Sequence, residues 1–159
     1  ETFIEPESLL TKNTRIKGLD GNEKMGKSLG NAINLIDDEE TVSKKVMGAI
    51  TDPNKIKKDD KANPDVCMVY YYHKLVNKEN VEIVCNECKN GSRGCVACKK
   101  ELIKHMMEFL EPIQTKRKYY EDNKEEVDKI LIDGTKYAKE VASKKMDEVR
   151  KNMKIDYFK

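Results

Sequence analysis

The chain has 159 residues and a formal net charge of +2, with charged and apolar residues each making up 38%. This length suits one hydrophobic core, or one domain with an appendage. A net charge near zero does not indicate a polyanionic partner, which would have to bind at local clusters of lysines. No apolar run approaches the length of about 18 residues that a membrane span needs, and no signal peptide opens the chain, so we expect a soluble cytoplasmic protein with no membrane partner.

The first ten residues, ETFIEPESLL, contain Pro6 and a few apolar positions, and we interpret them as a connecting segment that packs on polypeptide outside this chain. The chain starts with Glu1 rather than methionine, which indicates a continuing sequence. Acidic residues and apolar spacing after residue 36 then favour helices, so we place a boundary there.

Residues 18–31, GLDGNEKMGKSLGN, form a stretch typical of loops that handle nucleotides. It contains four glycines, two lysines and a serine: Gly18, Gly21, Gly26, Gly30, Lys24, Lys27 and Ser28. Glycines let a loop fold closely around a ligand, and ammonium groups three residues apart offer mobile charge to a polyphosphate. The alternative is an ordinary solvated lysine loop, because the chain has 31 lysines and arginines.

A second phosphate motif overlaps this stretch, because residues 21–28 satisfy G-x-x-x-x-G-K-[ST]. That motif needs a buried strand before it and a helix behind it. The preceding residues are too polar for a buried strand, and Gly30 with Asn31 interrupts a helix starting at Lys27. We therefore do not favour a P-loop.

The remainder predicts a mostly α, antiparallel helical bundle, since no segment alternates convincingly enough for a strand. Helices are expected from the acidic residues 37–40 to before Asp52, over 66–76, from Cys95 through Ile113 with a possible kink at Pro112, and over 125–152. Residues 81–87 fit either a short helix or an extended piece, and 89–94 a turn. Helical spacing gives the last helix an apolar face: Val127, Ile130, Leu131, Gly134, Tyr137, Ala138, Val141 and Val149. His73 and His105 have no recognisable catalytic partner and are expected to be ordinary helix residues.

Five cysteines stand at 67, 85, 88, 95 and 98. The pairs Cys85-x-x-Cys88 and Cys95-x-x-Cys98 suggest a tetrahedral zinc site, although the six residues between them are few for a zinc finger. Cys95-x-x-Cys98 at a helix start also resembles a redox motif, without the expected βαβ context. A third interpretation is that the cysteines are reduced thiols that bind no metal. Disulfides are less expected in a cytosolic protein.

Several motifs together resemble a known family. Lys24-Met25-Gly26-Lys27-Ser28 followed by Leu29-Gly30-Asn31 is similar to the KMSKS signature of class I aminoacyl-tRNA synthetases, with Gly26 where serine is usual. The flanks Arg15-Ile16, Thr51-Asp52-Pro53, Pro64-Asp65-Val66-Cys67 and Gly94-Cys95 resemble the bacterial type of the tryptophanyl-tRNA synthetase family. The likeness runs over nearly the whole chain.

The resemblance implies roles for the loop residues in activating tryptophan with ATP, which brings Mg²⁺. Lys24 and Lys27 would be the catalytic residues, stabilising the pyrophosphate that leaves. Ile16 and Met25 would lie near the adenine, and Gly26 and Ser28 with the loop amides would steady the phosphates. The loop would close a Rossmann-type catalytic domain that this chain lacks, so the chain alone, as a carboxy-terminal fragment, is expected to be inactive.

The resemblance also implies two domains with different functions, and a metal site. Residues 1–36 would end the catalytic domain, and residues 37–159 would form a helical domain that binds the anticodon region of tRNA(Trp). Cys67, Cys88, Cys95 and Cys98 would hold a [4Fe-4S] cluster, with Zn²⁺ as the alternative metal and Cys85 as the spare. Lys116, Arg117 and the lysines of residues 54–63 are candidates for RNA contact. The whole enzyme is expected to be a homodimer; the competing hypothesis is a non-catalytic, metal-stabilised helical module that binds RNA or protein.

Overall fold

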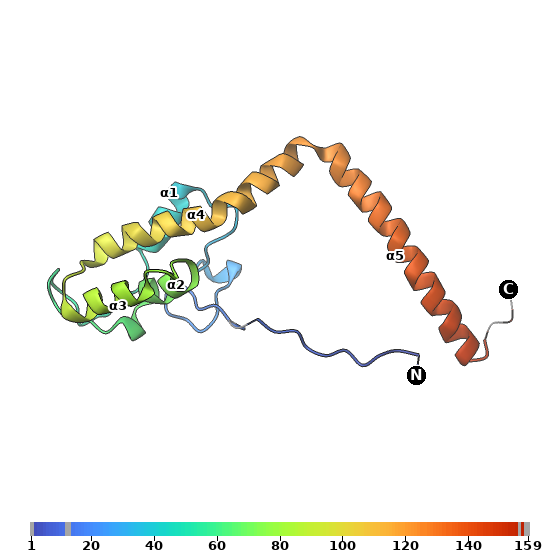
Figure 1. Cartoon of the computed structure of the whole chain (residues 1–159), viewed down its shortest axis with the longest axis horizontal. Helices are drawn as coiled ribbons and strands as arrows, with labels where there is room; N and C mark the ends of the chain where they lie inside the picture. The colour runs from blue at the N-terminus through green and yellow to red at the C-terminus, as the bar shows by residue number, and fades with distance from the viewer. Residues whose placement is uncertain (1, 12–13, 156, 158–159) are drawn as a thin grey trace. The chain divides into compact units, whose positions relative to one another are not determined.

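The computed structural model describes residues 2–11, 14–155 and 157, so the ends of the predicted domains at residues 1 and 159 lie outside the described part. Five α-helices occupy it, and no strand occurs among these residues. The mostly α helical bundle predicted from the sequence is confirmed (Figure 1). No helix in the described ranges is long and apolar enough to cross a membrane.

The chain divides into two compact units. One, the loop unit, comprises Lys12–Thr115, and the other, the tail unit, comprises Glu1–Thr11 with Lys116–Lys159. The loop unit holds the signature loop (residues 18–31), α1 (Glu39–Met47), α2 (Met68–Val76), α3 (Val81–Asn90) and most of α4 (Cys95–Asp122). The tail unit holds the end of α4 and all of α5 (Lys124–Asn152), which begins one residue before the helix predicted over 125–152. Each unit is therefore considered by itself.

Helix α1 (Glu39–Met47) begins where the sequence predicts. Asp38 caps it by accepting a hydrogen bond from the amide of Thr41 at 2.9 Å, and two glutamates in the first turn favour the positive end of the helix dipole. Val42 and Val46 are completely buried on its inner face. The helix ends at Gly48, four residues before Asp52.

Helices α2 (Met68–Val76) and α3 (Val81–Asn90) depart from the predicted boundaries in small ways. A short 3₁₀ turn, Pro64–Val66, precedes α2, and Cys67 between them has an extended backbone, so the predicted helix over 66–76 starts two residues late. The segment left open between helix and strand, 81–87, is helical and continues to Asn90, which shortens the predicted turn at 89–94. Gly91, with φ of +84°, ends α3.

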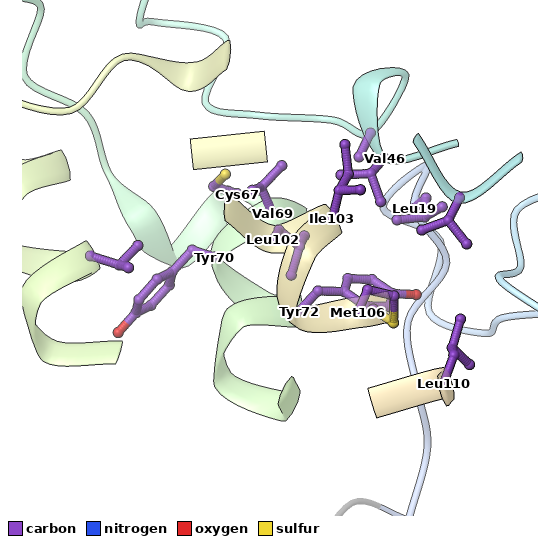
Figure 2. Packing of buried hydrophobic residues seen from close by; sticks show 13 residues of the cluster. Leu19, Val46, Cys67, Val69, Tyr70, Tyr72, Leu102, Ile103, Met106 and Leu110 are labelled. Carbon is purple, nitrogen blue, oxygen red and sulfur yellow. The ribbon is translucent and has the colours of Figure 1, made fainter. Parts of the chain in front are cut away.

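Helix α4 (Cys95–Asp122) contributes four buried side chains to the core. Pro112 lies inside it, and the buried side chains all precede that proline: Leu102, Ile103, Met106 and Leu110. They meet Val42 and Val46 of α1, Val69, Tyr70 and Tyr72 of α2, Val84 of α3 and Leu19 of the loop in one cluster (Figure 2). The core thus joins the loop directly to the helices.

Of three consecutive tyrosines in α2, two are buried and one is half-buried. Tyr72 is 2% exposed and donates its hydroxyl hydrogen to the carbonyl of Lys17 at 2.6 Å, so it ties α2 to the start of the loop. Burial raises the pKa of Tyr72 well above its usual value. Aromatic packing, rather than exposure for stacking on bases, is therefore the role of Tyr72 in the loop unit.

The segment between α1 and α2 is held by Asp52. Its carboxylate accepts hydrogen bonds from the amides of Asn63 (2.6 Å) and Asn54 (2.9 Å), and these two bonds lower the pKa of Asp52. A single side chain therefore closes the loop of residues 54–63. Sequence reasoning marked Asp52 only as part of a motif.

Asp52→Ala is expected to free both amides, because hydrogen bonds to a charged acceptor are among the stronger ones. Exchange of the Asn54 and Asn63 amides should accelerate roughly tenfold or more by hydrogen-exchange NMR. Since the pKa of Asp52 is lower when folded, the stability difference between wild type and variant should be present above pH of about 4 and shrink as the pH falls through the folded pKa. A difference independent of pH would contradict this role.

Candidate functional site

The signature loop folds back on itself through backbone hydrogen bonds. The amide of Met25 donates to the carbonyl of Ile16 at 2.8 Å, and the amide of Leu19 donates to the carbonyl of Asn31 at 3.1 Å. Ile16 and Met25 are half-buried and pack against the core cluster. The predicted adenine-side residues thus anchor the loop, and each keeps part of its surface exposed.

Asn31 is the side chain that clamps the loop. It is 5% exposed; its amide nitrogen donates to Asp20 Oδ1 (2.9 Å) and to the carbonyl of Lys24 (3.2 Å), and its oxygen accepts from the amide of Gly26 (2.9 Å). The hydrogen bond from Asn31 is the largest cause that lowers the pKa of Asp20. The motif that contains Asn31 does not predict this function; an asparagine directly after a turn glycine is the only signal for it in the sequence.

Two glycines of the loop differ in what they require. A Cβ atom at Gly18 would lie 2.1 Å from Asn31 Nδ2, so only glycine admits the clamp there. Gly26 has an ordinary extended backbone, with φ of −149°, and a Cβ there would meet only the side chain of Leu29, at 3.3 Å for the nearest atom. Because Leu29 is exposed, its side chain can yield, and the serine usual in this motif would fit.

The two predicted catalytic lysines extend into solvent. Lys24, Lys27 and Ser28 are all exposed, and neither lysine forms an ion pair with a described residue. Lys27 opens a 3₁₀ turn, Lys27–Leu29, that Gly30 ends with φ of +66°. The clamp therefore fixes the backbone at Lys24 and Gly26 while leaving both ammonium groups available to a ligand.

The same geometry excludes a P-loop. Among residues 14–36 no strand precedes the motif, and a turn of three residues follows it in place of an α-helix. A helix shorter than two turns supplies no aligned row of amides and little dipole for a phosphate. The alternative rejected from the sequence is also inconsistent with the structure.

Asn31→Ala is expected to loosen the loop without unfolding the core. The amide of Gly26 loses its acceptor, so its hydrogen exchange should accelerate roughly tenfold or more, and the pKa of Asp20 should rise toward its usual value by NMR titration. Asn22→Ala is the matched control, because Asn22 also donates to Asp20 but does not contact Gly26. Equal exchange of the Gly26 amide in both variants would contradict the clamp.

The five cysteines are free thiols; four lie on helices α3 and α4, and one lies directly before α2. Cys67 precedes α2, Cys85 and Cys88 lie on α3, and Cys95 and Cys98 lie in the first turn of α4. The thiols of the predicted ligands are close enough for the charge on one to raise the pKa of another: Cys95 acts on Cys67, and Cys67 acts on Cys88 and Cys98. The fold has gathered them in one region.

These thiols are not arranged as a metal site. Among the described residues, no group of three or more histidine, cysteine, aspartate or glutamate side chains could hold a metal ion. Burial is the main cause that raises the pKa of Cys67, of Cys88 and, to about 12, of Cys98. These three thiols are therefore protonated at neutral pH. Thiol donors suit either metal, but the described side chains form no group that could hold one. The structure gives no support to the predicted iron–sulfur or zinc centre beyond this proximity.

A hydrogen-bonded chain runs beside Cys98. His73 is fully buried; its Nε2 lies 3.2 Å from the carbonyl of Cys98, and its Nδ1 lies 3.0 Å from Asn77 Nδ2. Burial lowers the pKa of His73, so the ring is neutral, with Nε2–H donating to the carbonyl and Nδ1 accepting from Asn77. Asn77 also donates to Glu101, which pairs with Arg93. Both histidines are ordinary helix residues: His73 lies in the core, and His105 contacts Glu108 at 2.9 Å on the same helix.

A basic cavity of about 570 Å³ lies where α4 begins. Four lysines line it, Lys55, Lys57, Lys58 and Lys100, together with the exposed apolar side chains of Ile56 and Val96. Lys55 donates to the carbonyl of Asp60, whereas the other three form no ion pair with described residues. Of the predicted RNA contacts outside the cavity, Arg117 is paired with Glu121 at 2.7 Å and Lys116 is exposed.

Comparison with known proteins identifies the family. A family model described as tRNA synthetases class I (W and Y) matches residues 1–111. The chain belongs to this family. The tryptophan–tRNA ligase of Aquifex aeolicus is 44% identical over 155 residues, covering 96% of this chain and 39% of that protein. The enzyme of the same name from Thermotoga maritima is 38% identical over 157 residues, covering 98% of this chain and 48% of that protein.

Solved structures agree with the class I synthetase fold. Tryptophanyl-tRNA synthetase from Campylobacter jejuni, complexed with ADP and tryptophan, superposes with a TM-score of 0.76 at 21% identity, over 87% of this chain and 43% of that one. The resemblance to tryptophanyl-tRNA synthetases deduced from the motifs is thus confirmed, and the chain spans less than half the length of the relatives that it matches.

Proposed function

We propose that this chain is the carboxy-terminal part of a tryptophan–tRNA ligase and that its signature loop serves ATP during activation of tryptophan. The observation that carries the proposal is two exposed lysines, Lys24 and Lys27, with no ion-pair partner among the described residues, on a loop clamped by buried Asn31. The relatives at 44% and 38% identity support the reaction and the substrate.

The chemistry explains why two mobile cations on a fixed backbone are useful. The carboxylate of tryptophan attacks the α-phosphorus of ATP, the bond to the bridging oxygen breaks, and pyrophosphate leaves with its negative charge. Cations that tighten on those oxygens only as the bond breaks lower the barrier instead of merely holding ATP. Lys24 and Lys27 take this role, and Mg²⁺, bound with ATP, would share the charge on the phosphates.

The neighbouring loop residues would position the nucleotide. Ile16 and Met25, anchored in the core yet partly exposed, offer apolar surface to the adenine. The hydroxyl of Ser28 and the amides around Gly26 would hydrogen bond to phosphate oxygens. Residues 1–36 would then complete a Rossmann-type catalytic domain that supplies the tryptophan pocket, and the chain alone would be inactive.

The helical part, residues 37–159, would bind the anticodon region of tRNA(Trp). The basic cavity at the start of α4 supports this assignment, because lysines that form no ion pair with described residues suit phosphates and flanking apolar side chains suit a base. Lys116 would add a phosphate contact, whereas Arg117 would have to exchange Glu121 for RNA. The whole enzyme would act as a cytoplasmic homodimer.

Binding of a [4Fe-4S] cluster or Zn²⁺ by four of the cysteines stays a proposal, and it would require their thiols to draw closer together than they lie in this structure. In support, Cys85 has another partner: burial and, after it, hydrogen bonding with Cys85 raise the pKa of Tyr70 to about 12. That leaves Cys67, Cys88, Cys95 and Cys98 as donors. Their thiols would approach one another and lose their protons when the metal binds. Elemental analysis and visible absorption of anaerobically purified protein would distinguish iron, zinc and metal-free thiols.

Tryptophan-dependent exchange of labelled pyrophosphate into ATP tests the proposed reaction. We expect exchange by the longer protein that contains this chain and none by the 159-residue chain, which lacks the tryptophan pocket. The rival hypothesis, a non-catalytic helical module that binds RNA or protein, predicts no exchange by either. Exchange that depends on another amino acid would leave the ATP loop intact and refute only the choice of tryptophan.

A further inference from the structure

Helix α5 (Lys124–Asn152) carries an apolar stripe without a partner in the described residues. Val127, Leu131, Gly134, Ala138 and Val141 follow one another at spacings of four and three, which places them on one side of the helix. Leu131 is 61% exposed and Val141 is 50% exposed, and nothing lies within 4 Å of a Cβ built at Gly134. No residue of α5 is buried. A continuous exposed stripe of this kind marks an interface.

The stripe continues to the place where the start of the chain touches α5. Lys145 follows Val141 by four residues and Asn152 follows Lys145 by seven, so both share its side of the helix. Lys145 Nζ donates to the carbonyl of Thr2 at 3.0 Å, and Asn152 Nδ2 donates to the hydroxyl of Thr2 at 2.8 Å. The backbone at residue 2 is thus already seated on this side of α5.

The segment that follows Thr2 does not cover the stripe. Thr2 is half-buried, but Phe3, Ile4, Leu9 and Leu10 are exposed, Ile4 by 93% and Leu9 by 99%. The apolar residues of this segment and those of α5 are therefore both free to pack against further polypeptide. The relatives from Aquifex aeolicus and Thermotoga maritima contain such polypeptide, because the region matched by this chain is only 39% and 48% of their length.

We propose that the apolar stripe of α5 is the docking surface for the polypeptide that precedes Thr2 in the longer protein. That polypeptide joins the chain at a residue already bound to the stripe, so its docking adds little loop-closure entropy. A second copy of the chain fits less well, because it would compete with the Thr2 segment for Lys145 and Asn152. The inference rests on the proposed placement of this chain as the carboxy-terminal part of a longer protein, but it does not depend on the ligase reaction, which pyrophosphate exchange tests separately.

Two adjacent substitutions test the proposal. Leu131→Glu places a charge on the stripe, and Ile132→Glu, the matched control, places it about 100° away on a side chain that is 67% exposed. In the longer protein, Leu131→Glu should lower the thermal midpoint by about 5 °C or more, since a buried unpaired charge is costly. Ile132→Glu should change it little, and in the 159-residue chain neither variant should have an effect.

Hydrogen exchange of the unmodified proteins gives a second measurement that does not require a folded variant. Amides from Val127 to Val141 should be protected at least tenfold more in the longer protein than in the 159-residue chain. Equal protection, or equal effects of the two substitutions, would overturn the proposal. A destabilisation by Leu131→Glu in the 159-residue chain that grows with protein concentration would overturn it in favour of a second copy.

Discussion

Lys27→Ala in the longer protein is expected to reduce the turnover number for tryptophan-dependent pyrophosphate exchange roughly 10²–10³-fold, the usual cost of losing one group that stabilises transition-state charge. The KM for ATP should change little, because the ammonium group tightens on pyrophosphate as the bond breaks. The backbone should be unaffected, since the side chain of Lys27 has no ion-pair partner among described residues and the Asn31 clamp does not involve it.

Lys78→Ala is the matched control, being an exposed lysine in the loop unit but outside the loop. It should leave exchange unchanged. An unaltered rate for Lys27→Ala would refute the ligase assignment of the loop. A loss confined to the KM for ATP would instead show that Lys27 binds the ground state and the transition state equally, which contradicts the proposed role.

Leu102→Ala is expected to cause the largest loss of stability in the loop unit. Leu102 is completely buried in the cluster that joins α1, α2, α4 and the loop (Figure 2). Truncating it removes apolar burial and leaves a cavity, which together cost about 2–5 kcal/mol in the free energy of unfolding. Native-state hydrogen exchange of the α2 amides measures this free energy for the unit that contains Leu102.

Leu35→Ala makes the same chemical change at a site that is 54% exposed. It should cost less than about 0.5 kcal/mol, as most surface substitutions do. If the two variants were equally stable, the packing around Leu102 would not be what holds the unit together.

The helices and the loop were predictable because local signals agree there with the fold. Asp38 with Glu39 and Glu40 marks the start of α1, and the lysines of the signature loop occur in a recognisable motif. Residues 81–87 show the limit of prediction from local sequence, because a short apolar run fits either a helix or a strand. In the structure this segment is helical, and Val84 is buried against the core.

The parts that sequence could not provide depend on contacts between distant residues. Asn31 forms hydrogen bonds with both Asp20 and Gly26, and residue spacing alone does not predict such a contact. The apolar face of α5 was read correctly as a face but implied a packed helix, whereas the described residues leave it exposed. The cysteine spacing suggested a metal centre, yet spacing does not fix the distances between thiols on α3, on α4 and on the residue before α2.

The absence of buried side chains in α5 also determines how the 159-residue chain melts. A helix held by its own hydrogen bonds frays progressively from its ends, whereas the loop unit, with its shared core, loses structure all at once. Heating should therefore give a broad, early decline in helical circular dichroism that absorbs little heat, followed by one sharp calorimetric peak. The enthalpy of that peak belongs to the loop unit alone, so dividing it by the full chain length would understate the unfolding enthalpy per residue of that unit.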